Sequence, residues 1–304
     1  MIRKSTSGRS LRATTYYFFV IAGGLVLPGN CLAQAAVFMG CGFFDTPGIA
    51  PKVIASMKDG GFDTILLETH IAPDGRIRAN RTDLLNKGEW IAGEGKRRHV
   101  IDLVATVDRV EFWFAGWSRR DYDAIRKIKA DKQATANLRA NLAAVKALGV
   151  IGYTDDDEDV YDAELGVWMN QQIKASGLKN SITPYKRPDY WLPIIKRVGV
   201  DRIYYQSYFP RRKLAGWDKL DGELYVGLNS SKDDLESARN KFAAWGKNPK
   251  VVGGFVWSWQ ILNKKRDADF AGYSRAIRDG VSANATRLSS DDHPAVYRQP
   301  SPVR

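Results

Sequence analysis

The sequence predicts an α/β protein, a single-domain (β/α)8 TIM barrel. Between residues 36 and 280, eight short runs typical of buried β-strands alternate with runs that have helical spacing. This segment has the length that eight β–α units require. The alternative is an open, doubly wound sheet, but the Gly-Gly pairs of the chain lack the spacing of a dinucleotide-binding loop. The closed barrel is therefore favoured.

The expected elements follow from apolar periodicity and from turn residues. A small insertion is expected after the second strand, at 71–96, where Asp74-Gly75 indicates a turn and a small hairpin. The weakest helical pattern lies at 211–220. The eight strands are expected at 37–42, 64–70, 109–116, 150–156, 180–184, 202–208, 223–228 and 251–258. The main helices are expected at 49–58, 122–148, 165–176, 190–198, 233–245 and 269–278.

The two ends of the chain differ from the middle. Residues 1–35 resemble a signal peptide, with four basic and no acidic residues, an apolar run at 16–27 and small residues at 33–35. Cleavage would leave a mature chain from Ala36, secreted or periplasmic. The apolar run is short for a membrane span, so no stable span is expected after cleavage, although a retained N-terminal anchor is the alternative. Residues 281–304 are expected to form a flexible tail.

Charge and cysteine content limit the class of protein. Loss of the four basic residues of the leader would lower the net charge from +12 to +8. Of the two cysteines, Cys31 would leave with the leader and Cys41 would remain, so stability must come from an apolar core. No nucleic-acid-binding motif accompanies the basic charge. We expect a monomer.

The most informative segment for function is 148–159, where an apolar run ends in a cluster of carboxylates. On a strand, Thr154, Asp156 and Glu158 share one face, and Asp155 and Asp157 share the other. Same-face carboxylates two residues apart lie about 6.6 Å apart along the strand. This spacing suits a catalytic acid and an assisting neighbour. The alternative is a metal-binding or solvated acidic turn.

Other functional side chains are expected at the same end of the barrel, because active sites of this fold lie at the C-terminal strand ends. Aromatic groups beside carboxylates indicate a sugar-binding site, although Trp257 or Trp259 could instead fill the barrel. Glu68 and His70 lack a third metal ligand, so neither a metal nor a cofactor is expected. Glu111 is expected to face the helical layer. The rim residues are His70, Trp117, Asp156, Glu158, Tyr208, Trp257 and Trp259.

These residues carry a resemblance to the family 18 glycoside hydrolases, the chitinases and endo-β-N-acetylglucosaminidases. Their strand-four motif Asp-Gly-x-Asp-x-Asp-x-Glu is similar to residues 151–158, with Ile151 and Thr154 in place of two aspartates. The strand-three Ser-x-Gly-Gly-Trp resembles 113–117, the strand-six Met-x-Tyr-Asp resembles 206–209, and the strand-eight Gly-Gly-x-x-x-Trp-Ser resembles 253–258. The motifs occur in order over nearly the whole of 36–280.

The resemblance implies a retaining, substrate-assisted mechanism on N-acetylglucosamine-containing glycans. Glu158 would be the general acid and base, and Asp156, on the same face, would raise its pKa. Asp156 would orient the acetamido group, Tyr208 would bond its oxygen, and Trp257 would lie under the sugar. The remaining expected binding residues are Trp117, Trp259, Gln206, Thr154 and His70.

Two other functions are open at this point. One is a non-catalytic carbohydrate-binding barrel, which is supported by Ile151 and Thr154 in place of two motif aspartates. The other is a hydrolase of a different glycan with a two-carboxylate mechanism, in which Glu68 or Asp45 supplies the second carboxylate. Basic residues follow several strands, at 119–120, 186–187, 211–213 and 264–266. They suggest an anionic oligo- or polysaccharide, whereas ordinary solubilising charge is the alternative.

Overall fold

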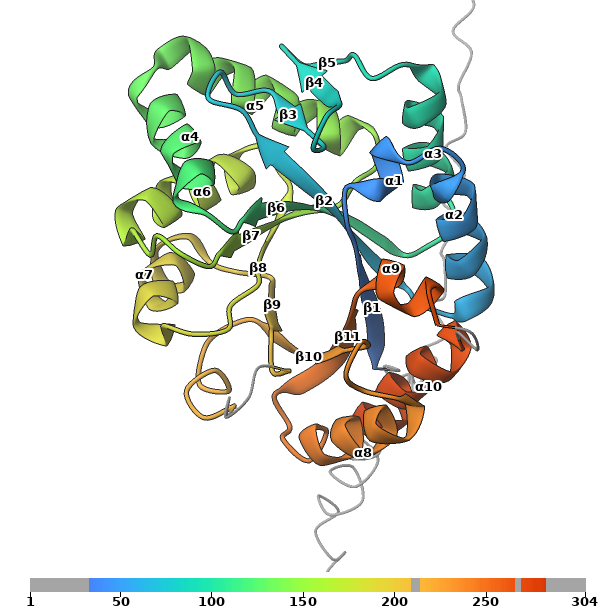
Figure 1. Ribbon diagram of the computed structural model, residues 1–304. Helices are drawn as coiled ribbons and strands as arrows, with labels where there is room; N and C mark the ends of the chain where they lie inside the picture. Colours follow the sequence, from blue (N-terminus) through green and yellow to red (C-terminus); the bar gives the residue numbers. More distant parts are fainter. Residues whose placement is uncertain (1–32, 209–213, 266–268, 283–304) are drawn as a thin grey trace, which may run out of the picture. The chain divides into compact units, whose positions relative to one another are not determined.

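The computed structural model describes residues 33–208, 214–265 and 269–282. Eight parallel strands form a closed ring, because β1 pairs with both β2 and β11 (Figure 1). The (β/α)8 barrel predicted from the sequence is confirmed. In ring order the strands are β1 (Gln34–Met39), β2 (Thr64–Ile71), β6 (Arg109–Gly116), β7 (Gly152–Asp157), β8 (Lys179–Ile182), β9 (Arg202–Tyr205), β10 (Glu223–Asn229) and β11 (Val251–Trp257).

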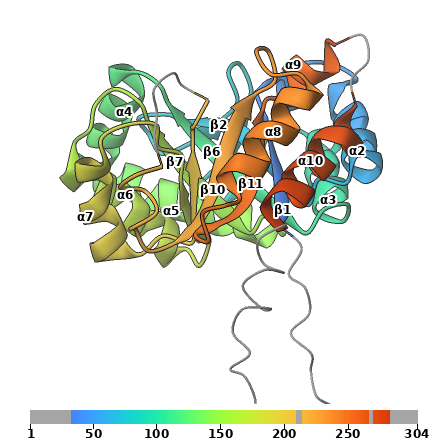
Figure 2. The same cartoon turned by 90° about the horizontal axis from the view of Figure 1, so that it is seen from below.

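Helices surround this ring, and their ends carry the capping residues that the sequence supplies. Asp131, Asp162 and Asp234 accept hydrogen bonds from backbone N–H groups at the starts of α5, α6 and α8. Figure 2 shows α8 and α10 side by side against β10 and β11. The helices are α2 (Ile49–Gly60), α3 (Glu94–Val104), α4 (Arg119–Ala130), α5 (Lys132–Ala147), α6 (Ala163–Ala175), α7 (Pro188–Val198), α8 (Leu235–Trp245) and α10 (Phe270–Ser282), with two short ones, α1 (Gly42–Asp45) and α9 (Trp259–Asn263).

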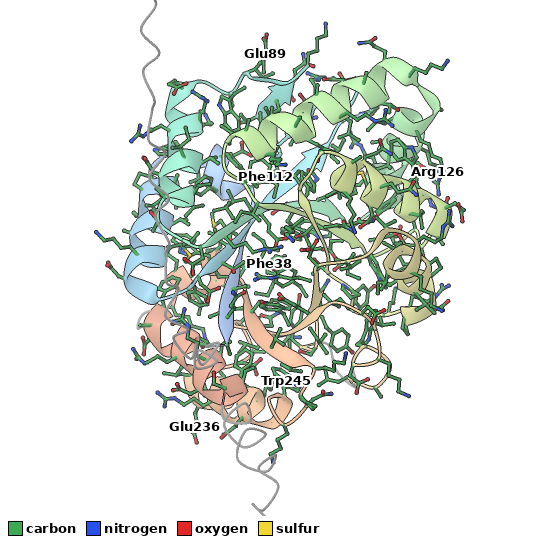
Figure 3. The ribbon with its side chains drawn as sticks, turned by 180° about the vertical axis from the view of Figure 1, so that it is seen from behind. Phe38, Glu89, Phe112, Arg126, Glu236 and Trp245 are labelled. Carbon is green, nitrogen blue, oxygen red and sulfur yellow. The ribbon has the colours of Figure 1, made fainter. Side chains whose placement is uncertain are left out.

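The apolar core has two parts, one between the strands and the helices and one inside the ring. The inner part is rich in aromatic rings, and the Phe38 ring lies 5.1 Å from Trp113 and 5.0 Å from Phe255, measured between centroids. Figure 3 shows Phe38 near the centre of the ring, with Glu89, Arg126 and Glu236 at the periphery. The barrel is thus filled with side chains, and its chemistry is confined to the strand ends.

Several predicted boundaries were wrong for identifiable reasons. The first strand begins and ends three residues earlier than expected, because Gly40 and Cys41 turn the chain into α1. The helix expected at 122–148 is two helices, since Asp131 is extended and caps the second. The helix α3 was not predicted. The described part of 211–220 forms turns and no α-helix.

The insertion after the second strand is confirmed and is larger than a hairpin. Asp74 and Gly75 turn the chain, with Gly75 at a φ of 85° that favours glycine. Three short strands then extend the sheet antiparallel from β2, namely β3 (Ile77–Arg78), β4 (Asp83–Asn86) and β5 (Glu89–Trp90). The buried Asn137 and Asn141 of α5 bond the backbone of this insertion and fix it on the barrel.

The predicted leader and tail lie mostly outside the described residues. Of 1–35, only residues 33–35 are described, and Gln34 and Ala35 belong to β1, although the predicted mature chain starts at Ala36. The helix α10 continues to Ser282, and the rest of the predicted tail lies outside the described ranges. Among the described residues, no helix combines the length and the apolar character that a membrane crossing needs.

Candidate active site

The carboxylates of β7 alternate between two sides of the barrel wall, as predicted from the sequence. Asp155 faces the helices, where it accepts hydrogen bonds from the Tyr122 hydroxyl at 2.6 Å and from Asn170 Nδ2 at 2.7 Å. Asp157 accepts the backbone N–H groups of residues 159–161. These two acids therefore organise neighbouring structure, and the inward side chains of Asp156 and Glu158 remain for chemistry.

Asp156 is buried and held by three neutral donors. Its Oδ2 accepts the indole N–H groups of Trp113 at 3.1 Å and Trp117 at 3.3 Å. Its Oδ1 accepts Gln206 Nε2 at 3.1 Å. No positively charged group among the described residues forms an ion pair with this carboxylate, so its negative charge is stabilised by dipoles alone.

Gln206 joins the two inward carboxylates. Its Nε2 also donates to Glu158 Oε1 at 3.1 Å, so the two acid oxygens lie at most twice this distance apart. Its Oε1 accepts the Tyr208 hydroxyl at 2.8 Å, and Nε2 additionally donates to the carbonyl of Thr183. Asp156, Glu158 and Tyr208, which the sequence predicted as a group, are thus brought together by Gln206.

Glu158 lies directly after β7, and its backbone is fixed on both sides. Its N–H donates to the carbonyl of Gly116 at 3.2 Å. Its own carbonyl accepts the hydroxyls of Tyr161 at 2.8 Å and Tyr185 at 3.1 Å. The side chain is partly exposed and can reach a ligand at the end of the barrel.

Burial raises the pKa of both inward acids. For Asp156, loss of hydration and the neighbouring charges of Glu158 and Asp155 raise the pKa well above its usual range. For Glu158, burial raises the pKa, while the Gln206 hydrogen bond and the Lys186 charge oppose the rise. The two acids therefore release their protons at higher pH than isolated carboxyl groups do. We expected from the sequence that like-charge repulsion by Asp156 would raise the pKa of Glu158. Desolvation is instead the largest cause of the raised pKa.

Thr154 lies on the same face but takes part in a different network. Its hydroxyl donates to Glu111, which also accepts from the Tyr204 hydroxyl at 2.9 Å and from Arg109 Nε. Glu111 thus faces the barrel interior, and the prediction that it faces the helices was wrong. Burial alone would raise its pKa, but the charges of Arg109 and Arg202 and the Thr154 bond lower it.

The two tryptophans at the end of β11 lie on different sides of the wall. The ring of Trp257 lies inside, 5.1 Å from Trp113 and perpendicular to it. The ring of Trp259 is buried under α9, donates to Ser56 Oγ of α2 and lies 6.1 Å from Phe270. Both tryptophans were expected at the rim, and this expectation was wrong for Trp259, because the chain turns into α9 at Ser258. Trp259 is therefore not among the residues that face the inward acids.

His70 and Trp117 lie at the rim beside the acids. Their rings are 6.4 Å apart and perpendicular, and Trp117 is 43% exposed although it bonds Asp156. His70 lies between Glu68 and Asp121. Trp117 can thus offer an open ring face next to a bound carboxylate.

The basic residues of the rim have different roles. Lys186 lies over the rings of Tyr161 and Tyr185, 5.0 and 4.8 Å from their centroids, and its charge reaches Glu158. Arg187 pairs with Asp189, and Lys265 donates to the Asp233 carbonyl. Residues 211–213 and 266 lie outside the described part of the chain. Sequence reasoning grouped these cations by position, and only the contacts single out Lys186.

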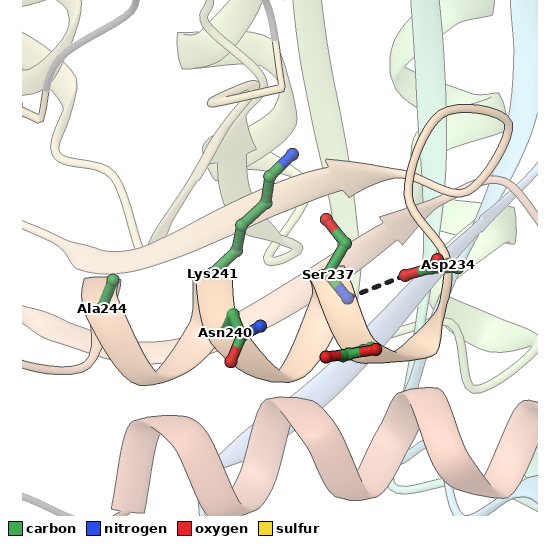
Figure 4. Close-up of a pocket in the computed structure, with 6 residues that line it drawn as sticks. Asp234, Ser237, Asn240, Lys241 and Ala244 are labelled. Atoms are coloured by element: carbon green, nitrogen blue, oxygen red, sulfur yellow. Dashed lines mark hydrogen bonds between the residues drawn. The ribbon is translucent and has the colours of Figure 1, made fainter.

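A surface hollow lies along α8 on the outside of the barrel, away from the inward acids (Figure 4). One helix and the residue that precedes it supply all of its walls, and the Asp234–Ser237 contact drawn there is the cap of that helix. It lacks acids and aromatic rings that converge from several strands. We therefore assign the candidate site to the strand ends. The hollow is lined by Asp234, Glu236, Ser237, Asn240, Lys241 and Ala244.

No protein-family model matches the sequence, and a search of curated proteins finds no match either. Many solved structures do match. A chitinase from Chromobacterium violaceum superposes with a TM-score of 0.57 at 10% identity, covering 80% of this chain and 98% of that one. The catalytic domain of a family GH18 chitinase from the fern Peteris ryukyuensis gives 0.56 at 12%, covering 82% and 99%. The chain has the fold of the family 18 chitinases.

The same fold also occurs in an agglutinin. A chitinase-like agglutinin from Robinia pseudoacacia gives a TM-score of 0.57 at 11% identity, covering 79% of this chain and 98% of that chain. The resemblance found in four strand motifs thus agrees with the three-dimensional fold. Because one fold serves both an enzyme and an agglutinin, function has to be argued from the site.

Proposed function

We propose that the protein is a secreted or periplasmic glycoside hydrolase that cleaves N-acetylglucosamine-containing glycans with retention. Glu158 protonates the glycosidic oxygen and later activates water. Asp156 orients the substrate's acetamido group, whose carbonyl attacks the anomeric carbon, and Tyr208 donates to that carbonyl. Trp257 lies under the distorted sugar. The mechanism needs no enzymic nucleophile and belongs to the substrate-assisted exceptions among glycosidases.

The observation that carries this proposal is the Asp156–Gln206–Glu158 bridge. It places a buried carboxylate with a strongly raised pKa beside a more exposed one, at the end of a barrel strand. Asp156 takes its hydrogen bonds from neutral donors, so it can stabilise a developing positive charge without first breaking an ion pair.

A two-carboxylate mechanism has less support. Asp45 accepts hydrogen bonds from Thr82 Oγ1 and from the Arg81 backbone, which tie it to the insertion. Glu68 accepts the Cys41 backbone N–H at 3.0 Å and lies 3.4 Å from His70. Both candidates for a nucleophile thus have other partners.

A non-catalytic carbohydrate-binding barrel is the second candidate. The replacement of two motif aspartates by Ile151 and Thr154 favours it. The structure offers a local reason for Thr154, because an aspartate there would face the charged Glu111. That replacement therefore follows from the inner network and does not by itself argue against catalysis.

We also propose that the substrate is anionic and that the protein acts as a monomer. Lys186 supports the first proposal, since it has a cation–π setting and its charge reaches the proposed acid. Nucleic acid is not proposed as a ligand.

The test is to incubate the exported protein and its Glu158→Gln variant with chitin oligomers, N-glycans and acidic polysaccharides, and to identify products by mass spectrometry. Asp159→Asn is the matched control, since Asp159 is exposed and adjacent. Cleavage of an N-acetylglucosaminyl bond that only Glu158→Gln loses is expected, together with tight binding of a thiazoline inhibitor. Cleavage only of glycans without acetamido groups would contradict substrate assistance. Binding without cleavage in all three proteins would favour the lectin.

A further inference from the structure

Three potential metal ligands meet at the C-terminal ends of the first two strands. The Cys41 thiol, one carboxylate oxygen of Glu68 and one ring nitrogen of His70 all lie within 4.8 Å of one another. Glu68 and His70 share a face of β2, and Cys41 lies in the turn between β1 and α1. The sequence did not reveal the third ligand, because Cys41 and Glu68 are 27 residues apart and meet only when the two strands pair.

The ligand atoms of Glu68 and His70 are spaced as two ligands of one ion would be. Glu68 Oε2 accepts the Cys41 backbone N–H at 3.0 Å, which leaves Oε1 facing His70 Nε2 at 3.4 Å. A tetrahedral zinc ion about 2.0–2.2 Å from each atom would separate them by roughly 3.3–3.5 Å. His70 Nε2 is itself buried and has no hydrogen-bond partner within the described part of the chain.

The other ring nitrogen of His70 faces a carboxylate, at a distance longer than a direct hydrogen bond. Its Nδ1 lies 3.8 Å from Asp121 Oδ1. Metal-bound histidines commonly present the second N–H to a carboxylate, which fixes the ring orientation. Asp121 is in turn held by the backbone N–H and the hydroxyl of Ser118 at the start of α4.

We propose that Cys41, Glu68 and His70 bind a zinc ion. One sulfur, one nitrogen and one oxygen ligand suit zinc, whereas calcium and magnesium prefer oxygen alone. Three protein ligands leave a fourth position for water or a ligand atom. The ion would link the end of β1 to the end of β2, beside the rim that carries Trp117. This inference does not depend on the glycosidase assignment.

A competing arrangement is an ion pair between a protonated His70 and the two carboxylates. In that arrangement the thiol keeps its contact with the Glu68 carbonyl, to which its sulfur donates at 3.8 Å. The two differ in one respect that can be measured, namely whether Cys41 becomes a thiolate bound to metal.

The experiment uses the full chain with Cys31→Ser, so that Cys41 is the only thiol. The protein is freed of metal with a chelator and titrated with Co²⁺, whose thiolate charge-transfer band reports sulfur ligation, and then with Zn²⁺ against a chromophoric chelator. Cys41→Ser and His70→Gln remove one ligand each. His99→Gln, on α3 and away from the three proposed ligands, is the matched control. Circular dichroism checks that each variant folds.

One zinc ion per chain, a thiolate–cobalt band, and loss of both in Cys41→Ser are expected. His70→Gln should weaken zinc binding by at least about 100-fold, and Asp121→Asn should weaken it by about 10–100-fold. The His99 variant should bind as the parent does. Absence of the band, or zinc binding that Cys41→Ser leaves unchanged, would overturn the proposal, and if either variant unfolds, the parent's cobalt spectrum alone decides the question.

Discussion

Two carboxylates inside the same barrel are equally buried and behave in opposite ways. Glu111, near the N-terminal ends of the strands, lies among Arg109, Arg202 and Tyr204, and its pKa is lowered. Asp156, near the C-terminal ends, accepts hydrogen bonds from indole and amide donors of the described residues, and its pKa is raised well above the usual range. Burial alone therefore does not decide the direction in which the pKa of a carboxyl group shifts.

The difference lies in whether a cation accompanies the charge. Arginines at the starts of β6 and β9 compensate Glu111, so its ionised form costs little and has no reason to change. Within the described part of the chain neither Asp156 nor Glu158 forms an ion pair, and the more distant Lys186 charge only partly offsets the raised pKa of Glu158. One half of the interior compensates a buried charge, and the other half holds the carboxyl groups to which the proposed function assigns proton transfer.

The largest effect is expected from Glu158→Gln. It removes the proposed acid, and hydrolysis should fall by about 10²–10⁴-fold. The melting temperature should not fall, because a poorly compensated carboxyl is replaced by a neutral amide. Steady-state kinetics and calorimetry test this together. If the Glu158→Gln variant lost stability but kept full activity, Glu158 would have the structural role that is assigned here to Glu111.

Glu111→Gln should do the opposite. It leaves Arg109 and Arg202 without their buried counter-charge, at an expected cost of about 3–5 kcal/mol in the free energy of unfolding. Chemical denaturation measures this, with Glu89→Gln at the exposed periphery as control. Residual folded protein should keep its turnover per molecule. If the free energy of unfolding were unchanged, the network around Glu111 would not depend on the charge of Glu111.

Thr154→Val tests whether Thr154 belongs to the hydrogen-bond network of Glu111 or to that of Asp156. It removes one hydrogen bond to a charged carboxylate and should cost about 1.5–3 kcal/mol. Thr154→Ser keeps the hydroxyl and should retain most of the stability. If the valine variant instead lost activity at unchanged stability, Thr154 would belong with Asp156.

The smallest effect is expected from Lys186→Met and concerns pH. The Lys186 charge stabilises ionised Glu158 and so lowers its pKa. Without it, Glu158 holds its proton to higher pH, and the alkaline limb of kcat/KM should move upward by less than about one unit, since Lys186 is partly exposed and screened. Lys232→Met is the control. A downward shift would contradict the direction of this interaction.

The barrel could be predicted from the sequence because the strands have strong apolar runs and the β–α alternation repeats. The orientation of 154–158 followed from strand periodicity alone. Boundaries failed where a single residue changes direction, as at Asp131 and Ser258. Gln206 entered only as a motif position, and its bridging role depends on β7 and β9 being brought to one end. The inward position of Glu111 depends on arginines from two strands, which local patterns do not reveal.

The fixed backbone of Glu158 has a further consequence. A residue just beyond a strand ordinarily frays, but here the Gly116 carbonyl and the hydroxyls of Tyr161 and Tyr185 hold its peptide groups. If Glu158 is the acid of the proposed hydrolase, its backbone requires no ordering when a sugar binds. The binding free energy of a long glycan can then go into distorting the ring, so chain length should influence turnover more than affinity.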